Sequence, residues 1–321
     1  MYKNLQLNEL LKHIPDIEEE KEKLNQQGSY HRLLGKCKPV SEEIINNIVN
    51  TIGEIFNREN IKFSPIGSFN KKKEGELYND IDLAVEYDIN GAVSNGSDLV
   101  SLLFKEFIDK EVFSSINDKF NTVSIPWKVT DELNVQVDFM FTDNLEFAEF
   151  VFHSPDFKKA ESKYKGMYAS VLLQSVIRNI PIDREYWEDG KLKEWKYYSL
   201  NQREGLLIKH KTYVGCKGQR IKQAKTVSVD VVSRDPKEII NIIFGNQEAF
   251  NYIYTFEGLL YYISSNKFNV IHKDFKKTFL ARVKNDFLTD WELELKTSNE
   301  LKREFENLFD KEIGKYETST F

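Results

Sequence analysis

The stretch GSFNKKKEGELYNDIDLAV, residues 67–85, decides the fold of the first half of this chain. It begins with Gly67-Ser68, continues through a polar loop, and ends where Asp80 and Asp82 alternate with apolar residues. Residues i and i+2 of a strand share a face, so the two carboxylates are expected on one face and the apolar side chains in a core. The pattern predicts a turn, a loop and a strand that displays two carboxylates.

A second stretch, LNVQVDFMF at residues 133–141, adds a third carboxylate. Its alternation predicts a strand with Gln136, Asp138 and Met140 on one face. If this strand lies beside the first, Asp80, Asp82 and Asp138 converge at one edge of a sheet. Neighbouring carboxylates repel each other unless they are solvated or a cation lies between them, and hard oxygen ligands suit Mg²⁺.

We therefore predict a catalytic metal centre formed by Asp80, Asp82 and Asp138. It would hold two Mg²⁺ ions, with Mn²⁺ as the alternative metal, against a nucleoside triphosphate. The competing interpretation is a set of carboxylates that merely keeps a strand edge soluble.

Gly67 and Ser68 have a separate predicted role in binding the nucleotide. Glycine permits a sharp backbone turn, and the backbone N–H groups and the serine hydroxyl can then donate hydrogen bonds to a phosphate. The loop just after this pair contains Lys71, Lys72 and Lys73, which either add positive charge or simply form a solvated loop.

These motifs resemble the nucleotidyltransferase superfamily of polymerase beta-like folds, over about residues 44–142. The resemblance implies a two-metal transfer of a nucleotidyl group from a nucleoside triphosphate. It implies that Asp80 and Asp82 bind metals and triphosphate, that Asp138 helps to activate the acceptor hydroxyl, and that Ser68 contacts the phosphates. The loop at 70–79 departs from the family pattern, because it lacks the usual second Gly-Thr or Gly-Ser pair.

Members of this family commonly add a helical domain that clamps the nucleotide. In this chain Lys163, Tyr164 and Lys165 begin the first predicted helix after the core. By the resemblance, Lys163 or Lys165 would reach the triphosphate, and Tyr164 or Tyr168 would stack on the base. The alternative is an exposed helix start with a half-buried tyrosine.

The order of predicted elements indicates an α+β chain. Apolar residues at helical spacing predict a helix that ends near Asn57. Strands are predicted at 61–66, 81–87, 123–129 and 133–141, the last two as a hairpin, with a helix at 99–112. We assign residues 1–40 to a helical extension, residues 41–144 to a nucleotidyltransferase core with a mixed sheet flanked by helices, and residues 145–321 to a mainly helical domain.

The second domain is predicted to hold helices at 158–178, 236–244, 247–264, 274–289 and 297–314. Asp235, Pro236 and Gly245 provide the N-cap, first-turn proline and C-terminal glycine of a short helix.

The segment 191–225 carries ten Lys and Arg against two Glu, whereas the whole chain of 321 residues has a net charge of −6. Cationic groups neutralise phosphates and aromatic rings stack on bases, so we predict an RNA or other phosphate-bearing acceptor here. Glycines in the segment suggest a turn between two strands, and the charges could instead pair with the acidic remainder. The candidate acceptor-binding residues are Arg203, Lys209, Lys211, Lys217 and Arg220.

The composition is that of an ordinary soluble protein, with 40% apolar and 30% charged residues. Two cysteines cannot build a disulfide framework, the N-terminus lacks a signal-peptide pattern, and no apolar run approaches the length of a membrane helix. We therefore expect a cytoplasmic protein with no membrane partner.

The predicted reaction transfers NMP from an NTP to an acceptor hydroxyl and releases pyrophosphate. The first acceptor considered is the 3′ end of RNA, such as tRNA, because of the basic segment. The second is a nucleotide, as in synthases of cyclic or linear oligonucleotide second messengers, which share this core and a helical lobe. Two further alternatives are a protein-modifying enzyme of toxin type and a catalytically inactive nucleotide sensor.

Overall fold

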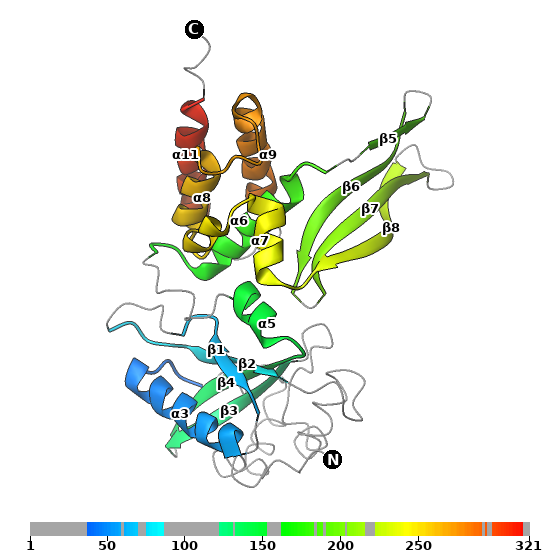
Figure 1. Ribbon diagram of the computed structural model, residues 1–321. Helices are drawn as coiled ribbons and strands as arrows, with labels where there is room; N and C mark the ends of the chain where they lie inside the picture. The colour runs from blue at the N-terminus through cyan, green and yellow to red at the C-terminus, as the bar shows by residue number, and fades with distance from the viewer. Residues whose placement is uncertain are drawn as a thin grey trace. The chain divides into compact units, whose positions relative to one another are not determined.

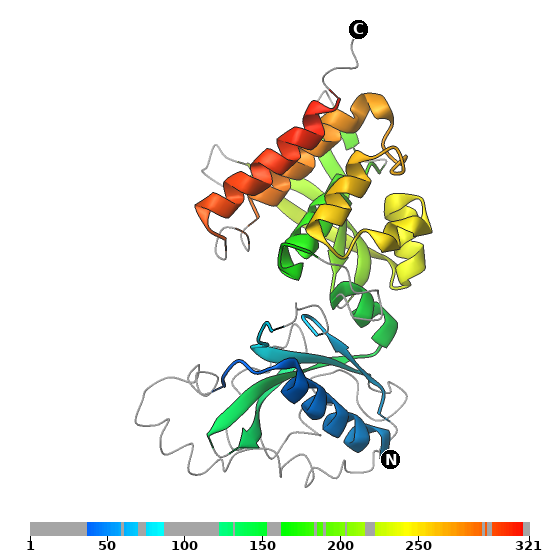
Figure 2. The same cartoon turned by 90° about the vertical axis from the view of Figure 1, so that its left-hand side faces the viewer.

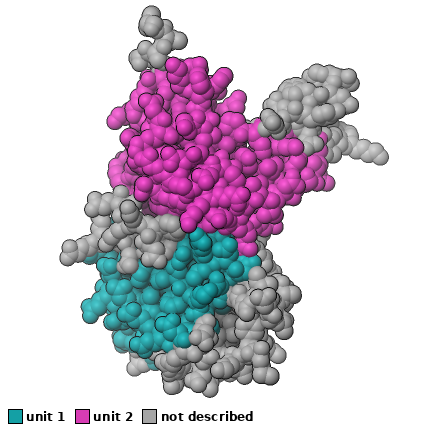
Figure 3. All heavy atoms as spheres, viewed as in Figure 1, with its two compact units in different colours: residues 1–159 teal, residues 160–321 magenta. Residues whose placement is uncertain are grey.

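The computed structural model divides the chain into two compact units, residues 1–159 and 160–321 (Figure 3). The division falls after the predicted boundary at residues 144 and 145, so residues 145–159 belong to the first unit. The structure describes residues 37–58, 61–69, 75–86, 122–130, 132–152, 162–182, 185–188, 191–202, 204–215, 222–290, 293 and 297–316. The helix predicted at 99–112 and most of the extension predicted at 1–40 lie outside these ranges.

A mixed four-stranded sheet forms the centre of the first unit (Figure 1). Its strands are β1 (Phe63–Ile66), β2 (Asp80–Glu86), β3 (Thr122–Thr130) and β4 (Leu133–Thr142). The spatial order is β1-β2-β4-β3, with β2 and β4 parallel and the other pairs antiparallel. The predicted hairpin is confirmed as β3 and β4, and the predicted neighbouring position of the two aspartate strands is confirmed as β2 and β4.

Helix α3 (Glu42–Arg58) covers one face of this sheet, as Figure 2 shows. Its apolar stripe, which includes Ile45, Ile52 and Phe56, is buried against the inward side chains of β2 and β4. The positive end of the helix dipole favours the two glutamates in its first turn, Glu42 and Glu43. The helix predicted from the isoleucine spacing is therefore confirmed. The sheet face that α3 covers forms the main core of this unit.

Helix α5 (Leu145–Phe152) packs on β1 and β2 on the other face. A small buried cluster of Ile66, Ala84 and Ala148 joins this helix to the sheet. Ala84 lies on the same side of β2 as Asp80 and Asp82, because these residues are separated by steps of two. The helix therefore covers the end of the face on which the aspartates lie.

A short segment before α3 also joins the sheet. Cys37 forms a β-bridge with Asn134, just after β4 begins, and Val40 forms one with Tyr78, just before β2. The N–H of Lys38 donates to the carbonyl of Asn134 at 3.0 Å, and Val40 and Tyr78 exchange backbone bonds of 2.9 and 2.8 Å. Residues 37–40 are therefore bonded to the starts of both aspartate strands.

The second unit contains the helices α6 (Gly166–Asn179), α7 (Pro236–Phe244), α8 (Phe256–Ser264), α9 (Lys276–Leu288) and α11 (Asn299–Gly314). Short 3-10 turns, η3 (Gln247–Asn251) and η4 (Lys273–Phe275), connect some of them. None of the helices in the described part of the chain has both the length and the apolar character needed to cross a membrane.

Helix α7 confirms the capping predicted from the sequence. The Asp235 carboxylate accepts hydrogen bonds from the N–H groups of Lys237 at 2.7 Å and Glu238 at 3.1 Å. Pro236 occupies the first turn, and Gly245 ends the helix in the left-handed region with φ of 71°.

The predicted mainly helical domain also contains a large antiparallel sheet. Its strands, in spatial order, are β5 (Glu185–Glu188), β6 (Lys191–Asn201), β7 (Gly205–Gly215) and β8 (Lys222–Ser233). Strands β6, β7 and the start of β8 fall within the basic segment 191–225, and the residues between β7 and β8, where the glycines suggest a turn, lie outside the described residues. The outer strand β8 has exposed valines at 227, 229 and 231, and its register with β7 shifts at two places.

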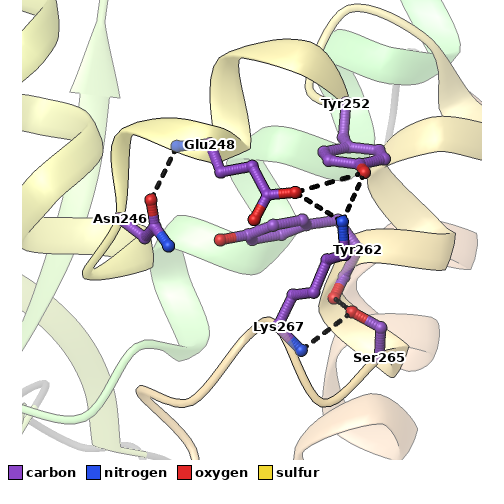
Figure 4. A network of polar contacts seen from close by, with 6 residues as sticks. All are labelled: Asn246, Glu248, Tyr252, Tyr262, Ser265 and Lys267. Atoms are coloured by element: carbon purple, nitrogen blue, oxygen red, sulfur yellow. Dashed lines mark hydrogen bonds and ion pairs between the residues drawn. The ribbon is translucent and has the colours of Figure 1, made fainter.

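Two polar arrangements stabilise the helical part of this unit. In the network of Figure 4, the Lys267 ammonium contacts the Glu248 carboxylate and the Tyr252 hydroxyl, beside the buried ring of Tyr262. Lys276 is buried, and its ammonium donates to the carbonyl of Ile263 in the last turn of α8 and to the carbonyls of Ser265 and Phe268 after it. Carbonyls in the last turn of a helix lack a partner inside the helix, so the lysine satisfies that of Ile263.

Candidate metal centre

The parallel pairing of β2 and β4 places two of the three predicted ligands side by side. Asp82 is the register partner of Asp138, and Ile66 on β1 is the register partner of Asp82. Register partners on neighbouring strands are about 4.8 Å apart and point to the same face. Asp80 lies two residues before Asp82, opposite Gln136, and therefore on that face as well.

The three aspartates lie on the face opposite the α3 core. Their neighbours Ile81, Leu83 and Val137 are buried with at most 2% exposure, whereas Asp80, Asp82 and Asp138 are half-buried. Partial exposure lets water solvate the carboxylates. The backbone register therefore places the three aspartates on one face of the sheet.

The carboxylate of Asp138 is held by its neighbour on β4. Nε2 of Gln136 donates to both oxygens of Asp138, at 2.9 and 3.0 Å. A carboxylate has about four lone-pair positions, so this amide orients the group without using all of its acceptor capacity. Gln136 is a positioning residue that the alternation of β4 places on the right face.

Gly67 forms the turn that follows β1 and lies against Asp82. Its φ is +66°, in the left-handed region, and an added Cβ would lie 2.1 Å from Oδ2 of Asp82. Only glycine satisfies both the conformation and the close approach. Its N–H donates to the carbonyl of Phe152 at 3.1 Å, so this donor is already used inside the unit.

Ser68 is half-buried in the same turn. In the part of the chain that the structure describes, no hydrogen bond is found for its hydroxyl or its N–H, so both remain available as phosphate donors. The predicted contributors Lys71, Lys72 and Lys73 lie outside the described residues.

Cys37 is a neighbour of the site that the sequence motifs do not reveal. Burial, and secondarily the charge of Asp138, raise the pKa of its thiol to about 11. The thiol is therefore neutral at ordinary pH. No local signal indicates this proximity, because it results from the pairing of residues 37–40 with the strands.

The donor set fits Mg²⁺ by its chemistry. Three carboxylates on one face supply hard oxygen ligands and negative charge. Within the described residues, however, no group of three or more His, Cys, Asp and Glu side chains is arranged so that it could hold a metal ion.

The predicted nucleotide-binding residues of the second unit make contacts within that unit. The ammonium of Lys163 pairs with the carboxylate of Glu304, and the Tyr164 hydroxyl donates to the same carboxylate at 2.5 Å. The Tyr164 ring packs against Phe305, with centroids 4.9 Å apart. Burial, and secondarily the Glu304 contact, raise the pKa of the Tyr164 phenol. Tyr164 is thus packed into the helical part of the unit, whereas Lys165 is exposed.

Two of the five candidate acceptor-binding residues lie on the described part of the sheet. Lys209 and Lys211 are on β7, opposite Tyr197 and Trp195 on β6. Arg203, Lys217 and Arg220 lie outside the described residues.

The sequence matches no family model, and no curated protein is significantly similar to it. The functional argument therefore depends on the residues and their arrangement.

Proposed function

We propose that this chain is a metal-dependent nucleotidyltransferase that moves NMP from an NTP to an acceptor hydroxyl and releases pyrophosphate. The observation that carries the proposal is the register of Asp82 with Asp138, with Asp80 on the same face two residues earlier. This arrangement of carboxylates on two parallel strands supports the likeness to polymerase beta-like nucleotidyltransferases.

In this proposal, Asp80 and Asp82 would hold Mg²⁺ against the triphosphate, and Asp138 would complete the centre beside the acceptor hydroxyl. When bound, Mg²⁺ supplies charge stabilisation for the attacking and leaving oxygens. Gln136 keeps the Asp138 carboxylate oriented, and the hydroxyl of Ser68 donates to a phosphate. Catalysis by the chain itself is then mainly positioning.

The RNA 3′ end is the proposed acceptor, because Lys209 and Lys211 lie beside aromatic rings on the second sheet. The proposed location is the cytoplasm, where NTPs and Mg²⁺ are available.

Incubation with each labelled NTP and Mg²⁺, with and without RNA, tests both the reaction and the acceptor. Label on RNA supports the proposal. Pyrophosphate release without RNA, with a small product, supports a second-messenger synthase, and label on protein supports a protein-modifying enzyme. No turnover with Mg²⁺ or Mn²⁺ and any acceptor supports a nucleotide sensor and contradicts the proposed activity.

Isosteric variants test the roles of the carboxylates. Asp80→Asn and Asp138→Asn should abolish turnover while the circular dichroism spectrum stays that of the wild type. Glu86→Gln is the matched control, because Glu86 lies on the same face of β2 but pairs with Lys62 at 2.8 Å, away from the aspartates. Retained turnover in either aspartate variant contradicts the assigned roles.

A further inference from the structure

The sheet of the second unit has two chemically different faces. On one face, Trp195 and Tyr197 of β6 lie opposite Lys211 and Lys209 of β7. On the other face, Lys196 lies opposite His210. We call the first of these the aromatic–lysine face, defined by Trp195, Tyr197, Lys209 and Lys211.

The cations of the aromatic–lysine face lie close to its rings. The ammonium of Lys211 lies 5.1 Å from the ring centroid of Tyr197, on a diagonal between the two strands. All four side chains are half-buried, so each remains partly accessible to solvent. The face therefore combines flat apolar rings with positive charge at a spacing that two neighbouring strands fix.

The opposite face carries an exposed carboxylate on its outer strand β8, and on the first face the register partner of Trp195 on the outer strand β5 is Glu185. Nε2 of His210 lies 2.7 Å from a carboxylate oxygen of Asp230, whose side chain is 63% exposed. This carboxylate adds negative charge to the face on which Lys196 and Tyr198 lie, and these two residues are the nearest counterparts of the lysines and rings on the first face.

We infer that the aromatic–lysine face binds single-stranded nucleic acid as the acceptor strand. Unpaired bases stack on aromatic rings while lysines neutralise the backbone, and a sheet with rings on its central strands is a known platform for this purpose. Base stacking is stronger than an exposed cation–π contact, so a base can displace the Lys211 ammonium from Tyr197 toward a phosphate. The inference rests on the proposed function, because it specifies the acceptor of that reaction.

Fluorescence anisotropy with a labelled single-stranded RNA 12-mer tests the inference directly. The assay contains no NTP and no metal, so its result does not depend on turnover. Tyr197→Ala should weaken binding about tenfold, whereas Tyr197→Phe, which keeps the ring, should bind within twofold of the wild type. Lys209→Ala should weaken binding and reduce the slope of log K against log salt by about 0.7.

Tyr198→Ala and Lys196→Ala are the matched controls, since each is adjacent in sequence to a tested position but lies on the opposite face. Both should bind RNA within twofold of the wild type at a temperature at which circular dichroism shows each variant to be folded. Equal losses on the two faces, or no RNA binding at low salt, overturn the inference. Duplex RNA that competes as well as the single strand also overturns it, because paired bases cannot stack on the rings. If pyrophosphate is released while RNA fails to bind, only the acceptor assignment fails.

Discussion

Replacement of Gly67 by alanine tests whether the turn after β1 positions the carboxylate of Asp82. The added Cβ would lie 2.1 Å from Oδ2 of Asp82, whereas unstrained contacts begin at about 3.5 Å. The carboxylate therefore has to move by more than about 1 Å, which it can do by rotation of its side chain. A displacement of a catalytic group by about 1 Å costs on the order of 100-fold in rate. We therefore expect the rate of pyrophosphate release to fall by about this factor in Gly67→Ala.

Gly75→Ala provides a closely matched control. Gly75 has φ of +84°, also in the left-handed region, but no atom of the described residues lies within 4 Å of an added Cβ. Both variants should lose about 1–2 kcal/mol of unfolding free energy from backbone strain, as measured by urea denaturation. The activity should fall only in Gly67→Ala, measured as released pyrophosphate under conditions where both variants are folded. Equal activity in the two variants would refute the role assigned to Gly67.

Three further predictions concern the second unit. Phe305→Ala should cost about 3–5 kcal/mol of unfolding free energy, because the ring is fully buried among Phe256, Phe287 and two tyrosines. Phe275, whose side chain is 67% exposed, is the control. A similar loss in Phe275→Ala would contradict this reasoning. Burial lowers the pKa of the Lys276 ammonium from 10.5 to about 8. Between these pH values the unfolded chain binds more protons than the folded chain, so the free energy of unfolding should rise by about 2 kcal/mol from about pH 7 to 9.5. Urea denaturation at both pH values should show that Lys276→Met lacks this rise, and the same rise in the variant would exclude Lys276 as its source. Lys163→Ala should raise the KM for NTP while changing stability by less than about 1 kcal/mol, because its pair with Glu304 is exposed; an unchanged KM would argue against nucleotide binding by Lys163.

Local patterns were sufficient to predict helix α3 and the strands β1 to β4 of the first unit, whereas helix α5 was not predicted. The isoleucine spacing predicts α3, and the alternation around Asp138 predicts β4 and the face on which its carboxylate lies. The caps of α7 follow from Asp235, Pro236 and Gly245, because each acts on backbone groups within a few residues.

Contacts between distant segments could not be predicted in the same way. The position of Cys37 near Asp138 depends on a β-bridge between residues that are far apart in the sequence. The bond from the Gly67 N–H to the Phe152 carbonyl likewise joins a turn to the end of a later helix. The roles of the three carboxylates in catalysis remain a prediction, since the register brings them to one face without a bound substrate.

The shifts of register in β8 have a consequence for self-association. Val227 and Val232 each lie where β8 has one residue more than β7, so the regular part between them is only Ser228–Val231. A long, straight, apolar outer strand invites edge-to-edge polymerisation, and bulges are one means by which natural sheets prevent it. The chain can therefore expose the valines of β8 to water, because the two bulges prevent a second molecule from forming a continuous set of backbone hydrogen bonds along this strand.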